Sequence, residues 1–205
     1  MKKYSIDYVS EVIGIKLTNY FSNCLNLSSD DREKLLIGAT VILFNMLEVC
    51  IVFTLAFLLG ILKETMLFTI MFVPLRMLAA GVHCKTGSTC LLITVIFYIG
   101  SSLLCKYCPI RISYAIILGI MCIIAFLKYA PADTENRPIL GEKHRRMIKI
   151  KTISIAVLIL VINILIKNAT LFNCAMYALI IETVSILPLT YKIFNYTYNN
   201  YKFYE

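Results

Sequence analysis

The sequence predicts an all-α integral membrane protein with about six transmembrane helices and an N-terminal amphipathic helix at the membrane interface. The composition supports this prediction. Hydrophobic residues make up 60% of the 205 residues, charged residues only 16%, and the mean hydropathy is +0.80. Soluble domains carry about 25% charged residues, which supply their water-exposed surface. A soluble enzyme, a disordered chain and a collagen-like fibre are therefore excluded, and lipid is the expected environment of most of the chain.

The first 34 residues predict an interfacial helix rather than a secretory signal. Their charges are balanced, and polar residues alternate with an apolar stripe that recurs every three or four positions. Asp30 and Glu33 then stand in a capping-box-like relation, which predicts the start of the next helix. The capping groups expected at this start are those of Ser28, Ser29, Asp30, Asp31 and Glu33. The stripe consists of Ile6, Val9, Ile13, Leu17, Tyr20, Cys24 and Leu27.

Six apolar segments predict the transmembrane helices. Residues 35–62 form the strongest segment, because they exceed the ~20 residues that cross the hydrocarbon core. Residues 66–80 contain Pro74 and Arg76, so this segment is expected to bend or to end within the interface. The remaining four segments cover residues 91–104, 112–127, 153–166 and 171–187.

These segments organise the chain into three regions. Residues 1–34 form the interfacial region, residues 35–188 the six-span membrane domain, and residues 189–205 a cytosolic tail rich in tyrosine. Tyrosine side chains are typical of the membrane interface, where the ring is apolar and the hydroxyl is hydrated. The tail tyrosines expected there are Tyr191, Tyr196, Tyr198, Tyr201 and Tyr204.

Lysine and arginine are distributed unevenly between the loops, which predicts the orientation. With the N-terminus inside, fifteen of the 20 Lys and Arg residues fall in inner segments and four in outer loops. Because positively charged loops stay in the cytosol, both termini of this multi-pass cell-membrane protein are expected there. The loops at about residues 81–90 and 128–151 are then cytosolic too, in the reducing compartment where thiols stay free.

Neither the net charge of +8 nor the eight cysteines predict a nucleic-acid, metal or cofactor partner. The excess of basic residues is typical of loops that face anionic lipid. The sequence contains no recognisable nucleic-acid-binding motif, so nucleic-acid binding is not expected. Cys105 and Cys108 have the spacing of metal ligands, but no second pair follows. The lipid bilayer is therefore an expected partner, and no metal or cofactor is expected.

The polar segment from residue 81 to residue 90 contains the residues best suited to chemistry. A cysteine nucleophile reacts as its thiolate, and a nearby imidazole can take the proton and return it to a leaving amine. On one straight helix His83 and Cys90 would lie about 10 Å apart by rise, too far for proton transfer. Gly87 can turn the chain so that the two side chains meet. A catalytic His83–Cys90 pair therefore requires a bend between them.

Other interpretations of these residues stay open at this point. An isolated Cys or His in a membrane protein also serves in packing or hydrogen bonding. Cys84 is a second candidate nucleophile, although adjacent residues project in different directions, and His144 is a second candidate base within a cationic stretch. Arg76 either binds a substrate carboxylate or pairs with Glu48 inside the helix bundle.

Two motifs resemble those of one family, the accessory gene regulator B proteins. Arg76, Gly81, His83 and Cys90 reproduce, with the same spacing, the Arg, Gly, His and Cys pattern of these membrane peptidases. Residues 129–139 resemble the Ala-Pro-Ala loop of the family, which a basic stretch and a proline follow. The two motifs occur in the family's order and between a similar number of apolar segments.

The sequence departs from the family pattern at two places. Many relatives carry Gly-Gly where this chain has Ala80 and Gly81. The lysine run that follows their Ala-Pro-Ala loop is displaced here to residues 143–151. The first change barely affects the catalytic pair, whereas the second prevents a residue-by-residue transfer of the loop's role.

The resemblance implies a cysteine endopeptidase that matures a quorum-sensing peptide in a Gram-positive bacterium. Cys90 would attack a carbonyl near the C-terminal segment of a short amphipathic propeptide (AgrD-like), and His83 would protonate the departing amine. A precursor thiol or hydroxyl would then close a thiolactone or lactone ring. Arg76, Gly81 and Gly87 would bind substrate or support the site. The family also implies a homodimer.

A different class of function remains as the alternative. Glu48, Arg76 and Glu182 are charged residues at membrane depth, which favours a small transporter or channel. A membrane scaffold, in which no single Cys or His is essential, is a third hypothesis.

Overall fold

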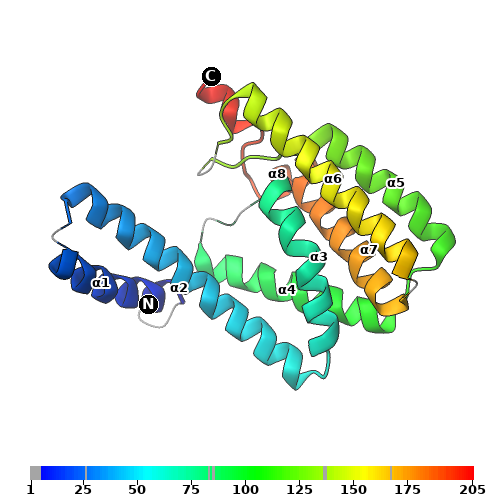
Figure 1. Ribbon diagram of the computed structural model, residues 1–205, viewed down its shortest axis with the longest axis horizontal. Coiled ribbons are helices and arrows are strands. Elements are labelled where there is room, and N and C mark those ends of the chain that lie inside the picture. The colour runs from blue at the N-terminus through cyan, green and yellow to red at the C-terminus, as the bar shows by residue number, and fades with distance from the viewer. Residues whose placement is uncertain (1–5, 26, 83, 85, 136–137, 167) are drawn as a thin grey trace. The chain divides into compact units, whose positions relative to one another are not determined.

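The structure is a computed structural model that describes residues 6–25, 27–82, 84, 86–135, 138–166 and 168–205. The chain divides into two compact units, one of residues 1–58 and 84–95 and the other of residues 59–83 and 96–205. The helices, shown in Figure 1, are α1 (Ile6–Leu25), α2 (Ser29–Leu58), α3 (Leu62–Ala79), α4 (Gly87–Tyr107), α5 (Ile112–Tyr129), α6 (Glu142–Ile166), α7 (Ala169–Ile186) and α8 (Pro188–Ile193), followed by the 3-10 helix η1 (Asn200–Phe203).

The predicted all-α membrane class is confirmed. Each of the six apolar segments forms a helix, and among the described residues the one β-type pairing is an isolated parallel bridge between Ala80 and Ala132. Helices α2, α4, α5 and α7 are long and apolar enough to cross a membrane. The count of six spans is not confirmed, because charged side chains interrupt α3 and occupy the first part of α6.

Helices α1 and α2 pack through small side chains in the first unit. The buried residues of α1 are Ser10, Gly14 and Thr18, which recur every four positions. A Cβ atom on Gly14 would lie 2.6 Å from Thr40 Oγ1 of α2, so a glycine is needed for this close approach. The predicted apolar stripe of α1 is helical, and most of it remains exposed, as expected of a helix that lies on lipid.

The start of α2 corrects the predicted capping pair. The Ser28 hydroxyl accepts a hydrogen bond from the Asp31 backbone N–H at 3.2 Å and donates to the Asp31 carboxylate at 2.7 Å. Ser28, one position before α2, is therefore the N-cap residue, and its hydroxyl bonds to both the backbone and the side chain of Asp31. Both residues were among the predicted capping groups, but the predicted pairing of Asp30 with Glu33 was wrong because it placed the helix start two residues too late.

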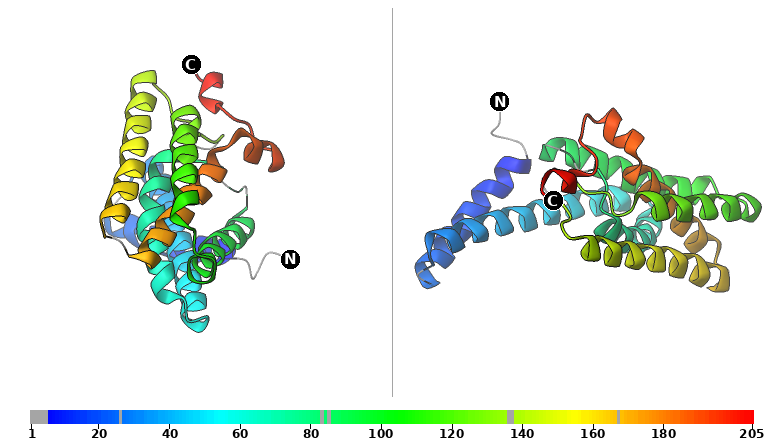
Figure 2. Two further views of the ribbon diagram at one scale, coloured as in Figure 1. Left: turned by 90° about the vertical axis from the view of Figure 1, so that its right-hand side faces the viewer. Right: turned by 90° about the horizontal axis from the view of Figure 1, so that it is seen from above.

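Helix α7 lies at the centre of the second unit. It packs against α3, α5 and α6, and the last two of these run side by side with it in Figures 1 and 2. Phe68 and Phe72 of α3 stack with ring centroids 5.1 Å apart and pack with Cys174 and Cys105 in one buried cluster. α3 continues through Pro74 as one helix, so the segment neither ends early nor leaves the helical path.

Candidate active site

His83 lies outside the described residues, as does position 85, whereas Val82, Cys84 and Thr86 are described. Helix α3 ends at Ala79 and α4 begins at Gly87. Between them the described residues are not helical, and Ala80 and Gly81 have φ angles of 62° and 102°. No single straight helix therefore runs from Ala79 to Cys90, and the His83–Cys90 pair stays a prediction.

Cys90 lies in the first turn of α4, in the first unit. The Cys90 backbone N–H donates to the Thr86 carbonyl at 3.0 Å, and the Thr86 hydroxyl accepts from the Thr89 N–H at 3.4 Å. Thr86 thus has the bonding of a residue that begins a helix. The Cys90 side chain is half-buried.

Gly87 is in close contact with both other helices of the first unit. A Cβ atom on this residue would overlap the Asp7 carboxylate of α1 and lie 2.6 Å from the Phe44 ring of α2. Sequence analysis assigned Gly87 to the turn. The structure gives it a different local role, since it lets the first turn of α4 approach α1 and α2.

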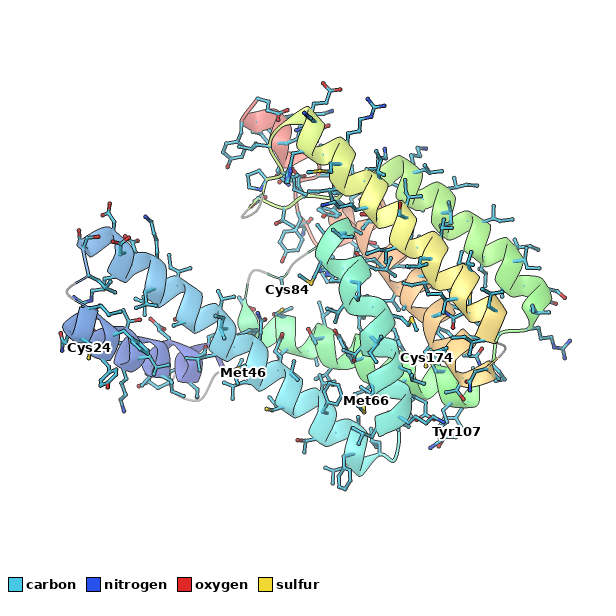
Figure 3. All side chains as sticks on the ribbon, viewed as in Figure 1. Cys24, Met46, Met66, Cys84, Tyr107 and Cys174 are labelled. Carbon is cyan, nitrogen blue, oxygen red and sulfur yellow. The ribbon has the colours of Figure 1, made fainter. Side chains whose placement is uncertain are left out.

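Two polar groups of the first unit lie beside the Cys90 thiol. Glu48 is only 8% exposed, and its carboxyl group and the Thr94 side chain lie close enough to the Cys90 thiol to influence its ionisation. Cys84, which Figure 3 labels in the segment before α4, is close enough to interact electrostatically with Cys90. The candidate nucleophile therefore has a buried carboxyl group as its direct neighbour.

Arg76 organises the chain ahead of His83, in the second unit. We call residues 79–82 the pre-His83 segment. The Arg76 guanidinium donates to the Ala80 carbonyl at 2.6 Å and to the Val82 carbonyl at 2.5 Å. A planar guanidinium can bond two carbonyls at once, which an ammonium group does not do in the same geometry. Arg76 thus holds the pre-His83 segment in place through hydrogen bonds to two carbonyl groups of that segment.

Two distant segments complete the bonding of the pre-His83 segment. The Gly81 N–H donates to the Ala132 carbonyl at 2.8 Å, and the Ala132 N–H donates to the Ala79 carbonyl at 2.9 Å. The Val82 N–H donates to the Ser185 carbonyl at 3.1 Å, and Arg76 also donates to the Ser185 hydroxyl. The Ala-Pro-Ala loop of residues 130–132 is therefore a direct backbone partner of the segment that leads to His83.

Gly81 cannot carry a side chain in this arrangement. A Cβ atom there would lie 2.5 Å from both Arg76 Nη1 and Ser185 Oγ, and its φ of 102° is one that L side chains rarely adopt. A glycine is therefore required at this position of the motif for both a steric and a conformational reason.

Glu182 is the carboxylate nearest to Arg76. Its Oε2 lies 3.9 Å from Arg76 Nη1, and the Glu182 side chain is fully buried. Neither carboxylate oxygen has a hydrogen-bond partner among the described residues. The sequence offered Glu48 as the ion-pair partner of Arg76, and the pair that the structure contains is with Glu182. A buried carboxylate without a nearby cation would be costly, so this pair accounts for two of the charges at membrane depth.

The tail folds back onto the Ala-Pro-Ala loop instead of lying free. The Asp133 carboxylate accepts from the backbone N–H groups of Asn200 at 2.9 Å and Tyr201 at 2.7 Å. The Tyr191 hydroxyl donates to the carbonyls of Ala132 and Asp133, each at 3.0 Å. The interfacial position predicted for Tyr191 is wrong, since this residue is 1% exposed.

The electrostatics of the tail favour these contacts. Burial raises the pKa of the Tyr191 phenol, and burial raises that of Tyr198 to about 12. Both phenols therefore keep their protons at neutral pH, and Tyr198 donates to the Tyr129 carbonyl at 3.2 Å. Arg145 donates to Glu205 at 2.7 Å and holds the pKa of that carboxyl below its usual range.

Sequence reasoning found the motif residues but missed their partners. Ser185 and Asp133 were not singled out, and Tyr191 was assigned to the membrane interface. Ser185 bonds to the pre-His83 segment, Tyr191 bonds to the loop beside it, and Asp133 joins the end of that loop to the tail. A signal was present for Asp133, an acidic residue directly after the Ala-Pro-Ala motif. No metal-binding cluster of His, Cys, Asp or Glu occurs within the described part of the chain.

These features define a multi-pass helical membrane protein in which the break between α3 and α4 falls within the Arg76 to Cys90 motif. A sequence model described as accessory gene regulator B matches residues 15–186. An AgrB-like protein of Clostridium acetobutylicum is 28% identical over all of this chain and 96% of its own length. A second AgrB-like protein, from Listeria innocua, is 31% identical over 86% of this chain and 88% of its own.

The chain belongs to the accessory gene regulator B family. Accessory gene regulator protein B of Staphylococcus intermedius is also similar, at 28% identity over 80% of this chain and 86% of its own length. No solved structure matches the chain. Membership of this family implies a role in the processing of quorum-sensing peptides.

Proposed function

We propose that the protein is a membrane-embedded cysteine endopeptidase that matures a quorum-sensing propeptide, with Cys90 as nucleophile and His83 as its proton-transfer partner. One observation carries the proposal. The helical path is interrupted between α3 and α4, within the Arg76 to Cys90 motif, and the residues before His83 are fixed by bonds from three parts of the second unit. Such fixed, non-helical backbone is typical of functional sites.

The proposed reaction has two steps. The Cys90 sulfur attacks a peptide carbonyl near the C-terminal segment of the propeptide, His83 protonates the departing amine, and an acyl thioester remains. A thiol or hydroxyl of the precursor then attacks this thioester and closes a thiolactone or lactone ring. Exchange of one thioester for another is nearly balanced in free energy, so the acyl group is preserved only where water is kept away.

The location of the reaction follows from the charge distribution. The positive-inside rule favours cytosolic termini and a cytosolic catalytic loop, where a short amphipathic propeptide at the inner membrane surface can reach Cys90. A homodimer is part of the proposal through the family. The transporter alternative loses support, because Arg76 is bonded to carbonyls of its own chain and faces Glu182.

The test is cleavage of the propeptide by variants of the two proposed catalytic residues. A short open reading frame beside the gene that encodes an amphipathic helix, a central Cys or Ser and an acidic tail supplies the precursor. Co-expression of this precursor with Cys90→Ala or His83→Ala is expected to leave it uncleaved, and Cys84→Ala is the matched control that keeps activity. The wild-type protein is also expected to form a hydroxylamine-sensitive adduct at Cys90. Normal cleavage by either variant would contradict the proposal.

A further inference from the structure

Glu48 is a buried acid in the middle of a membrane helix, and the proposed reaction so far gives it no role. Together with Val52 and Ala56 it forms the buried stripe of α2. The Glu48 Oε1 atom is buried and has no hydrogen-bond partner among the described residues. The side chains of Cys90 and Thr94 lie close enough to this carboxyl group to influence its ionisation. A carboxyl group at this depth is costly, and such residues are functional by default.

The contact between Glu48 and Cys90 is determined by the packing of the first unit. Gly87, three residues before Cys90, has the Phe44 ring of α2 where a side chain would otherwise be. Phe44 lies one helical turn before Glu48, so the same close approach of α4 to α2 brings Cys90 beside Glu48. The other titratable groups that face this place are Cys84 and, against Gly87, Asp7 of α1.

The charge balance of the first step favours a carboxylate as the proton acceptor. Transfer of the thiol proton to a neutral imidazole creates two opposite charges. Transfer to an ionised carboxylate creates none, because one negative charge moves from oxygen to sulfur. In a half-buried site of low dielectric constant the second transfer avoids the cost of creating charges.

We propose that Glu48 accepts the proton of the Cys90 thiol as the sulfur attacks the substrate carbonyl. This inference rests on the proposed peptidase function. In the first step the S–H proton moves to the Glu48 carboxylate, the S–C bond forms, and the C–N bond breaks while an imidazolium at His83 gives its proton to the leaving amine.

The second step restores the starting state. The precursor thiol gives its proton to His83 and attacks the thioester carbonyl, the S–C bond to Cys90 breaks, and the Cys90 thiolate takes its proton back from Glu48. Two different groups thus handle the two protons, Glu48 for the nucleophile and His83 for the leaving group and for the attacking thiol. No further reactant is needed.

The experiment compares Glu48→Gln with Glu33→Gln, the same substitution at an exposed position of α2. It uses the full-length protein and the precursor that the wild type cleaves. Glu48→Gln is expected to slow formation of the acyl-enzyme by about 100-fold or more, the range for loss of a positioned proton acceptor, with precursor binding unchanged. Glu48→Asp should keep part of the rate, and Glu33→Gln all of it.

Alkylation of Cys90 by iodoacetamide separates a chemical role from a structural one, with exposed Cys24 as the reference thiol. Iodoacetamide also reacts with the thiolate, so at neutral pH the loss of the proton acceptor should slow alkylation of Cys90 in Glu48→Gln together with cleavage. At a pH well above the usual pKa of a cysteine thiol, where the thiolate forms without an acceptor, alkylation of Cys90 in Glu48→Gln should be at least as fast as in the wild type. Alkylation that stays slower than in the wild type at this high pH would indicate a structural role and overturn the inference. Cleavage by Glu48→Gln within threefold of the wild-type rate would overturn it too. A wild-type protein that cleaves no precursor would overturn the proposed function and the inference together.

Discussion

The two flanks of the proposed catalytic pair are held by different physical means. Before His83, the backbone adopts positive φ angles at two successive residues and is bonded by Arg76, Ala132 and Ser185. At Cys90, the backbone is an ordinary first helical turn, placed by close packing at Gly87. The segment before His83 therefore depends on hydrogen bonds that compensate unfavourable φ angles. The position of Cys90 depends instead on the absence of a side chain at Gly87.

The largest expected effect is on the hydrogen-bonded flank. Arg76→Ala removes the guanidinium from the Ala80 and Val82 carbonyls and leaves Glu182 buried without its cation. Precursor cleavage should fall below about 1% of the wild-type rate, and the free energy of unfolding by about 2–4 kcal/mol. Measurement of cleavage and of the thermal midpoint in detergent checks this, with exposed Arg111→Ala as control. An Arg76→Ala protein with full activity would mean that the pre-His83 segment needs no such support.

The two motif glycines offer a direct test of the comparison. Gly81→Ala puts a side chain at a φ of 102° and 2.5 Å from two polar atoms, so a loss of about 2–3 kcal/mol and of most activity is expected. Gly87 is helical, and an added Cβ atom would meet two side chains, the Asp7 carboxylate and the Phe44 ring, and no backbone atom nearer than these, so Gly87→Ala should cost only about 1–2 kcal/mol.

Two further substitutions control the glycine experiment. Asp7→Ala should partly restore Gly87→Ala by removing the overlap, and it should not restore Gly81→Ala. Gly38→Ala, with no atom within 4 Å of the added Cβ, should leave stability unchanged or slightly higher. Thermal unfolding of each variant provides the measurement. Equal losses at Gly81 and Gly87 would remove the distinction between the flanks.

The smallest expected effect is at Asp133, which bonds to the tail and not to the pre-His83 segment itself. Asp133→Asn keeps one acceptor oxygen but loses the charge that binds the Asn200 and Tyr201 N–H groups. We expect the tail to loosen at a cost of about 1 kcal/mol, with faster proteolysis after residue 190 and a two- to fivefold decrease in cleavage. Glu33→Gln on the exposed start of α2 serves as control. Unchanged proteolysis would show that the tail does not support the Ala-Pro-Ala loop.

Much of the fold and part of the site could be predicted from the sequence. The six apolar segments all became helices, since a run of apolar residues can satisfy its backbone in lipid only by helix formation. The motif from Arg76 to Cys90 was recognisable because its reactive residues lie in one short polar stretch. The α2 cap was misplaced because several adjacent polar residues could all begin a helix.

The partners of the motif were beyond prediction for a physical reason. Ser185 bonds to Arg76 across 109 positions of the chain, and Asp133 binds the tail across 68. Neither contact leaves a periodicity or a local spacing in the sequence. Tyr191 was misjudged for the same reason, since a tyrosine suited to the membrane interface is equally suited to a buried site where its hydroxyl finds two carbonyls.

The sequence by itself determined that this protein is a helical membrane protein of a peptide-processing family, and it predicted which segment contains the reactive residues. Those properties depend on composition and on residues close together in the chain. The tertiary structure alone decided that Arg76 and Ala132 hold the segment before His83 and that a buried Glu48 lies beside Cys90. These neighbours are set by how helices pack, because packing brings distant positions together through shape and hydrogen bonding that no single stretch of sequence encodes.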